Sequence, residues 1–224
     1  MKANKIIFLI IFLANSLLAQ ILSTLSASVE YSEDYFPFNE NVELIFESNV
    51  GETETSVERL DSLYKLINVS DDFIYSRTFL KKDNGIFLHR TEQKISTFFY
   101  STEVEITYSE PVLQFPLPIS VGDIWNWSGY QMKNGDTTEV SIIGEAIGEE
   151  KVELPAGKFN TLKIKVLFEE KDGEKTTLYQ WFAPGVGSVK TKVIIEGKGI
   201  IQFAMSLLGY DEIDSELKEI RHLE

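Results

Sequence analysis

The chain has 224 residues, 43% of them hydrophobic and 12% aromatic, which is enough for one β-rich domain or two small ones with an apolar core. Its 35 acidic residues against 21 Lys and Arg give a formal net charge of -14, which disfavours nucleic acids and anionic membrane surfaces as partners. It contains no cysteine, which excludes disulfides and cysteine nucleophiles.

The first nineteen residues have the order of a secretory signal peptide. Lys2 and Lys5 precede an unbroken apolar run, Ile6–Ala14, and small residues follow at Ser16 and Ala19. This run is shorter than the roughly 20 apolar residues that span a bilayer, and no later run is longer. We expect cleavage after Ala19, or after Ser16 as the alternative, and a periplasmic or secreted protein. Without a cysteine to lipidate, it is not expected to be a lipoprotein.

Residues 20–34 are polar and serine-rich, which predicts a loose leader. From residue 35 on, apolar and polar residues alternate, as in strands with one face on a core and the other in water. Clear examples are Val42–Glu47, Glu103–Tyr108, Thr161–Phe168 and Val189–Ile195. Parallel strands buried on both faces would lack this alternation, so we expect a single antiparallel β domain over residues 35–213.

Turn sequences separate these runs, at Asp83–Gly85, Asn134–Gly135, Asp172–Gly173 and Gly197–Gly199. Asn-Gly and Asp-Gly favour tight hairpins because both residue types tolerate a positive φ. Pro184–Gly185 is typical of a type II turn. The strands therefore follow one another in a meander of about ten to twelve, at the spacing seen in sandwiches and barrels.

Three segments leave the secondary structure open. Residues 55–67 fit either a helical face or a strand, and the strands on both sides favour a strand. Residues 109–120 contain three prolines, which predicts an extended crossing or an edge segment, because proline cannot donate in a central ladder. Residues 214–224 predict a short helix capped by Asp214 or Ser215, with a frayed tail as the alternative.

Reactive and metal-binding residues are scarce. Two histidines, His89 and His222, are too few for a structural zinc site, and Asp71–Asp72 lacks the spacing of a calcium loop. There is no Gly-x-Ser-x-Gly elbow, and His89 alternates within a strand pattern that places it in solvent. Pro184–Gly187 lacks the lysine and helix of a phosphate-binding loop. We therefore expect no catalytic residue, metal or cofactor.

The most distinctive remaining feature is aromatic. Trp125 and Trp127 are two apart and share a strand face, with Tyr130 nearby, and Tyr179 and Trp181 repeat the arrangement. These five residues are our candidate pocket for an apolar ligand or a sugar ring. The alternative is ordinary sheet core, since large rings fill the interior of a β domain well.

Four segments resemble an uncharacterised group of secreted bacterial proteins classed as domains of unknown function: Pro116–Pro118, Gly122–Trp125, Val152–Phe159 and Trp181–Lys190. The likeness is good over residues 111–210 and holds in outline over 35–110. It implies a curved antiparallel sheet, a half-barrel or barrel-like fold similar to that of periplasmic lipoprotein carriers. The motifs themselves are turn and sheet-shaping sequences, without a reactive group.

Together these observations predict an exported, non-catalytic protein that binds or carries an apolar molecule, a lipid or an envelope protein. The alternative is a structural or interaction protein of the cell envelope with a filled core, and a glycan-active enzyme is a third, less favoured possibility. A carrier needs a cavity lined by the tryptophans, whereas a structural protein would bury them without a void.

Overall fold

The computed structural model describes residues 30–71, 73–97, 100–171, 173, 175–196 and 212–223. The predicted signal peptide, residues 20–29 of the predicted leader and the turn at 197–199 lie outside these residues. The described elements are one 3-10 helix, η1 (Glu33–Tyr35), and the strands β1 (Glu30–Tyr31), β2 (Val42–Ser48), β3 (Gly51–Leu60), β4 (Leu63–Val69), β5 (Phe73–Lys82), β6 (Gly85–Thr97), β7 (Tyr100–Pro116), β8 (Ile119–Ser120), β9 (Ile124–Lys133), β10 (Asp136–Leu154), β11 (Gly157–Glu170), β12 (Lys175–Ala183), β13 (Gly187–Glu196) and β14 (Glu212–His222).

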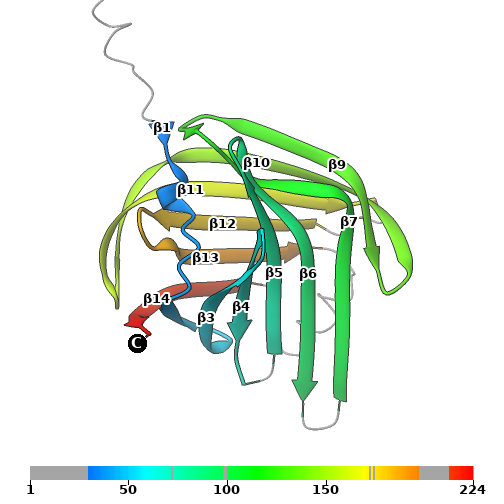
Figure 1. Cartoon of the computed structure of the whole chain (residues 1–224), viewed down its shortest axis with the longest axis horizontal. Helices are drawn as coiled ribbons and strands as arrows, with labels where there is room; N and C mark the ends of the chain where they lie inside the picture. The colour runs from blue at the N-terminus through cyan, green and yellow to red at the C-terminus, as the bar shows by residue number, and fades with distance from the viewer. Residues whose placement is uncertain are drawn as a thin grey trace, which may run out of the picture. The chain divides into compact units, whose positions relative to one another are not determined.

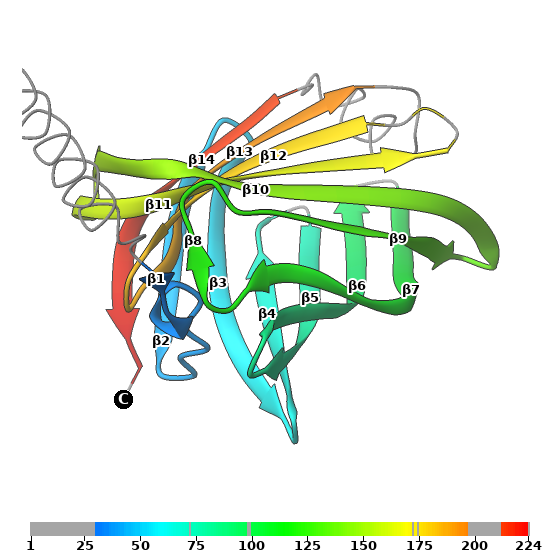
Figure 2. The ribbon, with the colours of Figure 1, turned by 90° about the horizontal axis from the view of Figure 1, so that it is seen from above.

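Twelve of these strands form a closed antiparallel barrel in the order β10-β11-β12-β13-β14-β2-β3-β4-β5-β6-β7-β9 (Figures 1 and 2). Most neighbours in the barrel are also neighbours in sequence, so the predicted antiparallel meander is confirmed. Of the two shapes left open by the sequence, the barrel is the one observed, and the half-barrel was wrong. The remaining pair, β1 and β8, forms a separate two-stranded sheet.

Those predicted turns that fall within the described residues lie between paired strands. Asn134 and Gly135 both have positive φ, 53° and 94°, in the tight hairpin that joins β9 to β10. Gly185 has φ 74° in the turn between β12 and β13, as the type II prediction requires. Residues 55–67 are the adjacent strands β3 and β4, so the strand interpretation is confirmed.

The C-terminal helix prediction was wrong, because residues 212–222 are strand β14. This strand pairs with β13 on one side and β2 on the other, and so closes the sheet between them. Its residue Leu217 is fully buried. The Glu, Leu and Lys residues of the segment favour a helix locally, but the pairing with two open strand edges outweighs that preference.

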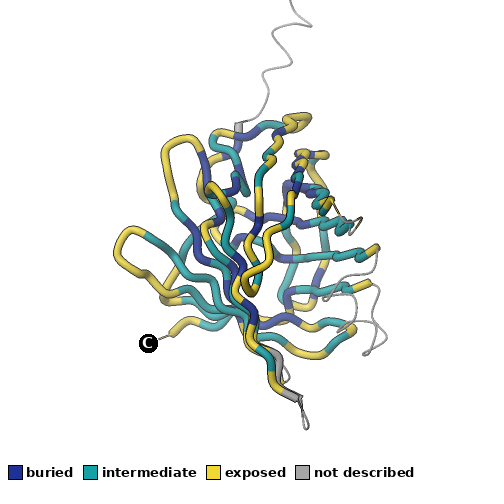
Figure 3. Tube along the Cα trace, turned by 90° about the vertical axis from the view of Figure 1, so that its right-hand side faces the viewer, coloured by how far each residue is buried: buried dark blue, intermediate teal, exposed yellow. Residues whose placement is uncertain are grey.

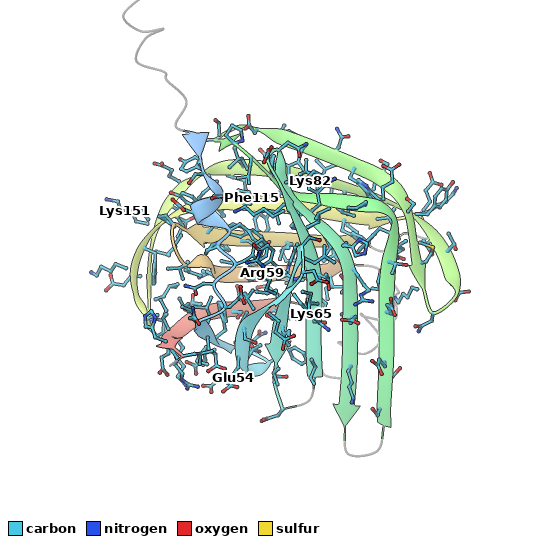
Figure 4. The ribbon with its side chains drawn as sticks, viewed as in Figure 1. Glu54, Arg59, Lys65, Lys82, Phe115 and Lys151 are labelled. Carbon is cyan, nitrogen blue, oxygen red and sulfur yellow. The ribbon has the colours of Figure 1, made fainter. Side chains whose placement is uncertain are left out.

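The barrel encloses a cluster of aromatic and aliphatic side chains, which we call the first cluster. Its buried members include Phe79 of β5, Phe115 of β7 and Phe182 of β12 (Phe115 is labelled in Figure 4). The rings of Phe115 and Phe182 lie 5.2 Å apart, although β7 and β12 are not neighbours in the sheet. The contact therefore crosses the barrel, and the face that carries the first cluster is the inner face.

The segment after residue 30 is part of this core. Tyr31 is buried in the first cluster, and Tyr35, Phe36 and Phe38 pack against it. The Phe36 ring lies 5.3 Å from that of Phe79 and 5.7 Å from that of Phe182. A loose leader was therefore wrong for residues 31–34, because the aromatic residues around η1 fill one end of the barrel.

The wall of the barrel is interrupted between β7 and β9. The prolines predict an extended crossing or an edge segment here, and Pro111 lies in a bulge where β7 residues 108–111 face only His89 of β6. Beyond the bulge β7 turns away, so β9 pairs with it only at Ile106, Thr107 and Tyr108 (Figure 2). We call this interruption, from Ser109 to Phe115 on β7, the seam.

Candidate functional site

The structure places four of the five candidate aromatic residues in two separate clusters. Trp125 is a buried member of the first cluster, and Trp127 packs against it. Trp181 is buried in a second cluster with Leu217 and Val189, and Tyr179 packs there. Phe182, the neighbour of Trp181, belongs to the first cluster, and successive strand residues point to opposite faces. Trp181 therefore lies on the outer face, and the five residues do not form one pocket.

Trp125 closes the seam from the β9 side. Its side chain is 7% exposed, and its Nε1 donates a hydrogen bond of 3.1 Å to the backbone oxygen of Leu113 on β7. The ring lies directly over Gly144, its partner on β10, where an added Cβ would be 2.1 Å from the ring atom Cε2. The glycine is therefore required for the ring to lie flat against the sheet.

Trp127 takes a similar position further along β9 but remains half-buried. Its ring packs edge-to-face on Tyr108 of β7, with the ring centroids 5.8 Å apart. Gly129 makes room for it, because a Cβ there would lie 2.7 Å from the Trp127 ring. Trp127 thus presents part of an apolar ring to the inside of the barrel.

Tyr130 does not belong to this inner group. Its side chain is 53% exposed, and it lies an odd number of residues from Trp127, so that it points to the outer face. Only its backbone takes part in the seam, where its N–H donates to Ser109 Oγ at 3.1 Å.

Trp181 is held on the outer face by charged side chains. Its Nε1 donates to Glu150 Oε2 at 2.9 Å, and Lys163 Nζ lies 4.5 Å from the ring centroid. The hydrogen bond from Trp181, together with the bond and charge of Lys163, lowers the pKa of Glu150, although partial burial opposes the shift. Lys163 also pairs with Glu150 at 3.2 Å. These groups satisfy one another, which indicates a structural role for Trp181.

The inner face is packed at one end and partly accessible elsewhere. Phe79, Ile86 and Phe115 are completely buried at the end filled by the N-terminal segment. Several other residues pack against the first cluster but stay partly exposed, namely Leu66, Tyr108, Trp127, Phe168 and Leu178. Figure 3 shows this mixture of buried and intermediate residues along the strands. We call these five residues the accessible lining, and it is the candidate ligand site.

The polar groups next to the accessible lining were missed in the sequence. Arg77 lies on β5 between Tyr75 and Phe79, whose alternation is visible in the sequence, so an inward-facing arginine could have been noticed. Gln131 of β9 is buried, and its amide donates to the Glu170 carboxylate of β11. Burial raises the pKa of Tyr108 far above its usual range.

Other features of the described part of the chain give no second site. No group of three or more His, Asp or Glu side chains there could hold a metal ion. His89 is exposed on β6, as predicted. A polar recess of about 310 Å³ lies beside Glu33, Arg59 and Lys81, but Lys81 and Glu33 form an ion pair within it. Among the described residues, no helix is long and apolar enough to cross a membrane.

Comparison with known proteins places this chain in one family. The family described as DUF3108-like matches residues 39–194, while no curated protein matches. Three similar solved structures are a candidate lipoprotein from Parabacteroides distasonis, a candidate exported protein with YmcC-like fold from Bacteroides fragilis, and the hypothetical lipoprotein YmcC from Escherichia coli. Their identities to this chain are 17%, 16% and 9%, each with a TM-score of 0.44. The matches cover 84%, 83% and 88% of this chain and 98%, 97% and 92% of the other.

Proposed function

Because this chain belongs to the DUF3108-like family, a family of unknown function, its role has to be inferred from its own side chains, and we propose that it is an exported, non-catalytic protein that binds an apolar molecule inside its barrel. The matched residues 39–194 include every motif on which the resemblance was based. The family match thus confirms the resemblance found in the sequence.

The observation that carries the proposal is the partial exposure of apolar residues that point into a closed barrel. Tyr108, Trp127, Phe168 and Leu178 pack against the first cluster, yet none of them is fully buried. A core without space would bury such side chains as completely as it buries Phe79 and Phe115. Barrels with more strands than eight leave room for a ligand between their walls.

The composition of the lining supports binding rather than catalysis. Its surface is aromatic and aliphatic, which suits a hydrocarbon chain that leaves water. Glu170, the carboxylate beside Gln131, is bonded to that amide rather than to a nucleophile. Binding by non-covalent contact requires no further group.

Binding of a pyrene-labelled fatty acid tests the proposal. The unmodified protein should bind this probe saturably at micromolar concentration, about 8 kcal/mol of binding free energy. Trp127→Ala should weaken the affinity by about 10- to 150-fold, because ring contacts of this kind contribute about 1.5–3 kcal/mol. Fluorescence titration and thermal melting of the same samples measure affinity and stability separately.

Tyr130→Ala is the matched control for Trp127→Ala. Tyr130 lies on the same strand but on the outer face, so its replacement should change neither affinity nor melting temperature. If the unmodified protein binds no probe and Trp127→Ala instead loses about 3–5 kcal/mol of stability, the ring is packed core and the proposal is wrong.

That outcome would favour the alternative function, an interaction protein of the cell envelope. One separate observation supports this alternative. The outer face of β9 and β10 exposes Ile124, Ile143 and Ile147, with Ile124 68% exposed. Large exposed aliphatic side chains on neighbouring strands are typical of surfaces that contact another protein. This second candidate function needs no space inside the barrel.

A further inference from the structure

A positively charged residue, Arg77, points into the barrel beside the accessible lining. It alternates on β5 with Tyr75 and Phe79, and Phe79 is a completely buried member of the first cluster. Its partner on β4 is Leu66, which also packs against that cluster. Residues two apart on a strand share a face, so the Arg77 side chain lies on the inner face.

The guanidinium of Arg77 lacks a counter-ion within the described residues. Its Cζ lies 5.5 Å from the ring centroid of Phe79 and 5.7 Å from that of Tyr75. Its Nε is buried without a hydrogen-bond partner, and no ion pair with Arg77 is found in the described part of the chain. A partly buried cation held only by aromatic rings is stabilised further by an anion that comes from outside.

Polar and apolar groups meet at this point. Thr91 is the cross-strand partner of Arg77 on β6, and the Tyr108 hydroxyl is hydrogen-bonded to Thr91. The Tyr108 ring in turn packs on Trp127, at 5.8 Å between centroids. A ligand with its charged group at Arg77 could therefore lay its apolar chain along Trp127.

One carboxylate faces the same region. Glu170 acts on Tyr108 through its charge, and it accepts a hydrogen bond from the buried amide of Gln131. It belongs to β11, across the barrel from β5, and among the described residues it is bonded to Gln131 and not to Arg77. Gln131 thus holds Glu170 on its own side, and the N–H donors at the edge of the Arg77 guanidinium are left for another acceptor.

We infer that the ligand of this barrel is an acidic amphiphile, whose carboxylate or phosphate head binds Arg77 while its apolar chain lies along Trp127 and the rest of the accessible lining. The inference rests on the proposed function and names the class of ligand for that site. Arginine suits both head groups, because its planar fork donates two parallel hydrogen bonds to either anion. Recognition therefore depends on the charge of the head group and on the apolar contacts of the chain.

Three pyrene-labelled probes of equal chain length test the inference: a fatty acid, its uncharged methyl ester and an alkyl phosphate. The unmodified protein should bind the acid or the phosphate about tenfold more tightly than the ester, and the better of the two identifies the head group. Arg77→Met should abolish this preference while leaving the affinity for the ester unchanged. Arg77→Lys keeps the charge and should restore part of the preference.

Arg59→Met is the matched control, since it removes the same charge. Arg59 lies on β3, is exposed and also sits over a tyrosine, with its Cζ 5.9 Å from the ring centroid of Tyr64 (Figure 4). Its replacement should leave the preference for the charged probes intact. A general effect of net charge would instead appear equally in both variants.

Equal affinity of the unmodified protein for ester, acid and phosphate would overturn the inference while the proposed function stands. The same conclusion follows if Arg77→Met keeps the preference. Failure of all three probes to bind would overturn the proposed function together with the inference. The comparison of probes on the unmodified protein needs no variant, so the result does not depend on how well Arg77→Met folds.

Discussion

Replacing Trp125 with alanine is expected to lower the free energy of unfolding by about 3–5 kcal/mol. The ring is almost completely buried in the first cluster, and its Nε1 gives β9 a hydrogen bond to Leu113 of β7. Alanine would open a cavity and remove this bond where the ladder between the two strands has ended. Chemical denaturation of both proteins measures the loss, and Ile124→Ala, an exposed neighbour on the outer face, should cost less than about 0.5 kcal/mol.

A double-mutant cycle with Gly144 makes this prediction sharper. In the unmodified protein Gly144→Ala should destabilise by about 1–3 kcal/mol, because the new Cβ would overlap the Trp125 ring. In the Trp125→Ala background the ring is gone, and the same substitution should cost much less. Strictly additive effects would show that the ring does not lie over Gly144.

The second large effect is expected at Phe36. Phe36→Ala should lower the free energy of unfolding by about 3 kcal/mol, since it removes ring contacts to Phe38, Phe79, Phe115 and Phe182. This result would show that the segment after residue 30 belongs to the fold. The measurement is the denaturation midpoint together with an unchanged slope.

Glu40→Ala provides the control for Phe36→Ala, because Glu40 follows in the same segment and is exposed. Its replacement should change stability by less than about 0.5 kcal/mol. If Phe36→Ala were equally neutral, the aromatic segment would not fill the end of the barrel.

The local pattern of the sequence was sufficient for the strands and the tight turns. The alternation over residues 161–168 predicts a strand with one buried face, and Asn134–Gly135 predicts a tight hairpin. Both are observed. Closure of the barrel could not be predicted in the same way. It depends on pairs such as β14 with β2, which lie far apart in the chain and leave no local signal.

The two errors in element assignment have the same physical origin. The sequence predicted a helix at residues 214–222 and a leader at residues 31–34, because both segments are rich in polar residues that need no buried partner. In the structure each is held by distant partners: Leu217 in the second cluster and Tyr31 in the first. The structure of such segments is determined by the burial of one or two apolar side chains against distant strands.

Of the accessible lining, only Trp127 was among the residues singled out from the sequence. Spacing by two correctly placed Trp125 with Trp127 and Tyr179 with Trp181 on shared faces. It could not tell that the second pair faces outward, since that depends on how the sheet curves. Arg77 was overlooked because a lone arginine in a strand is usually solvated.

The central claim, that an apolar chain binds inside the barrel beside Trp127, is tested most directly by fluorescence quenching. The chain has three tryptophans, so Trp125→Phe combined with Trp181→Phe leaves Trp127 as the only tryptophan. A fatty acid brominated on its chain quenches a tryptophan only when the two are in contact. We predict that Trp127 emission falls saturably with this acid, at the same midpoint as binding of the pyrene-labelled acid. Unchanged Trp127 emission in a variant that still binds the pyrene-labelled acid would contradict the account, because the ligand would then lie elsewhere.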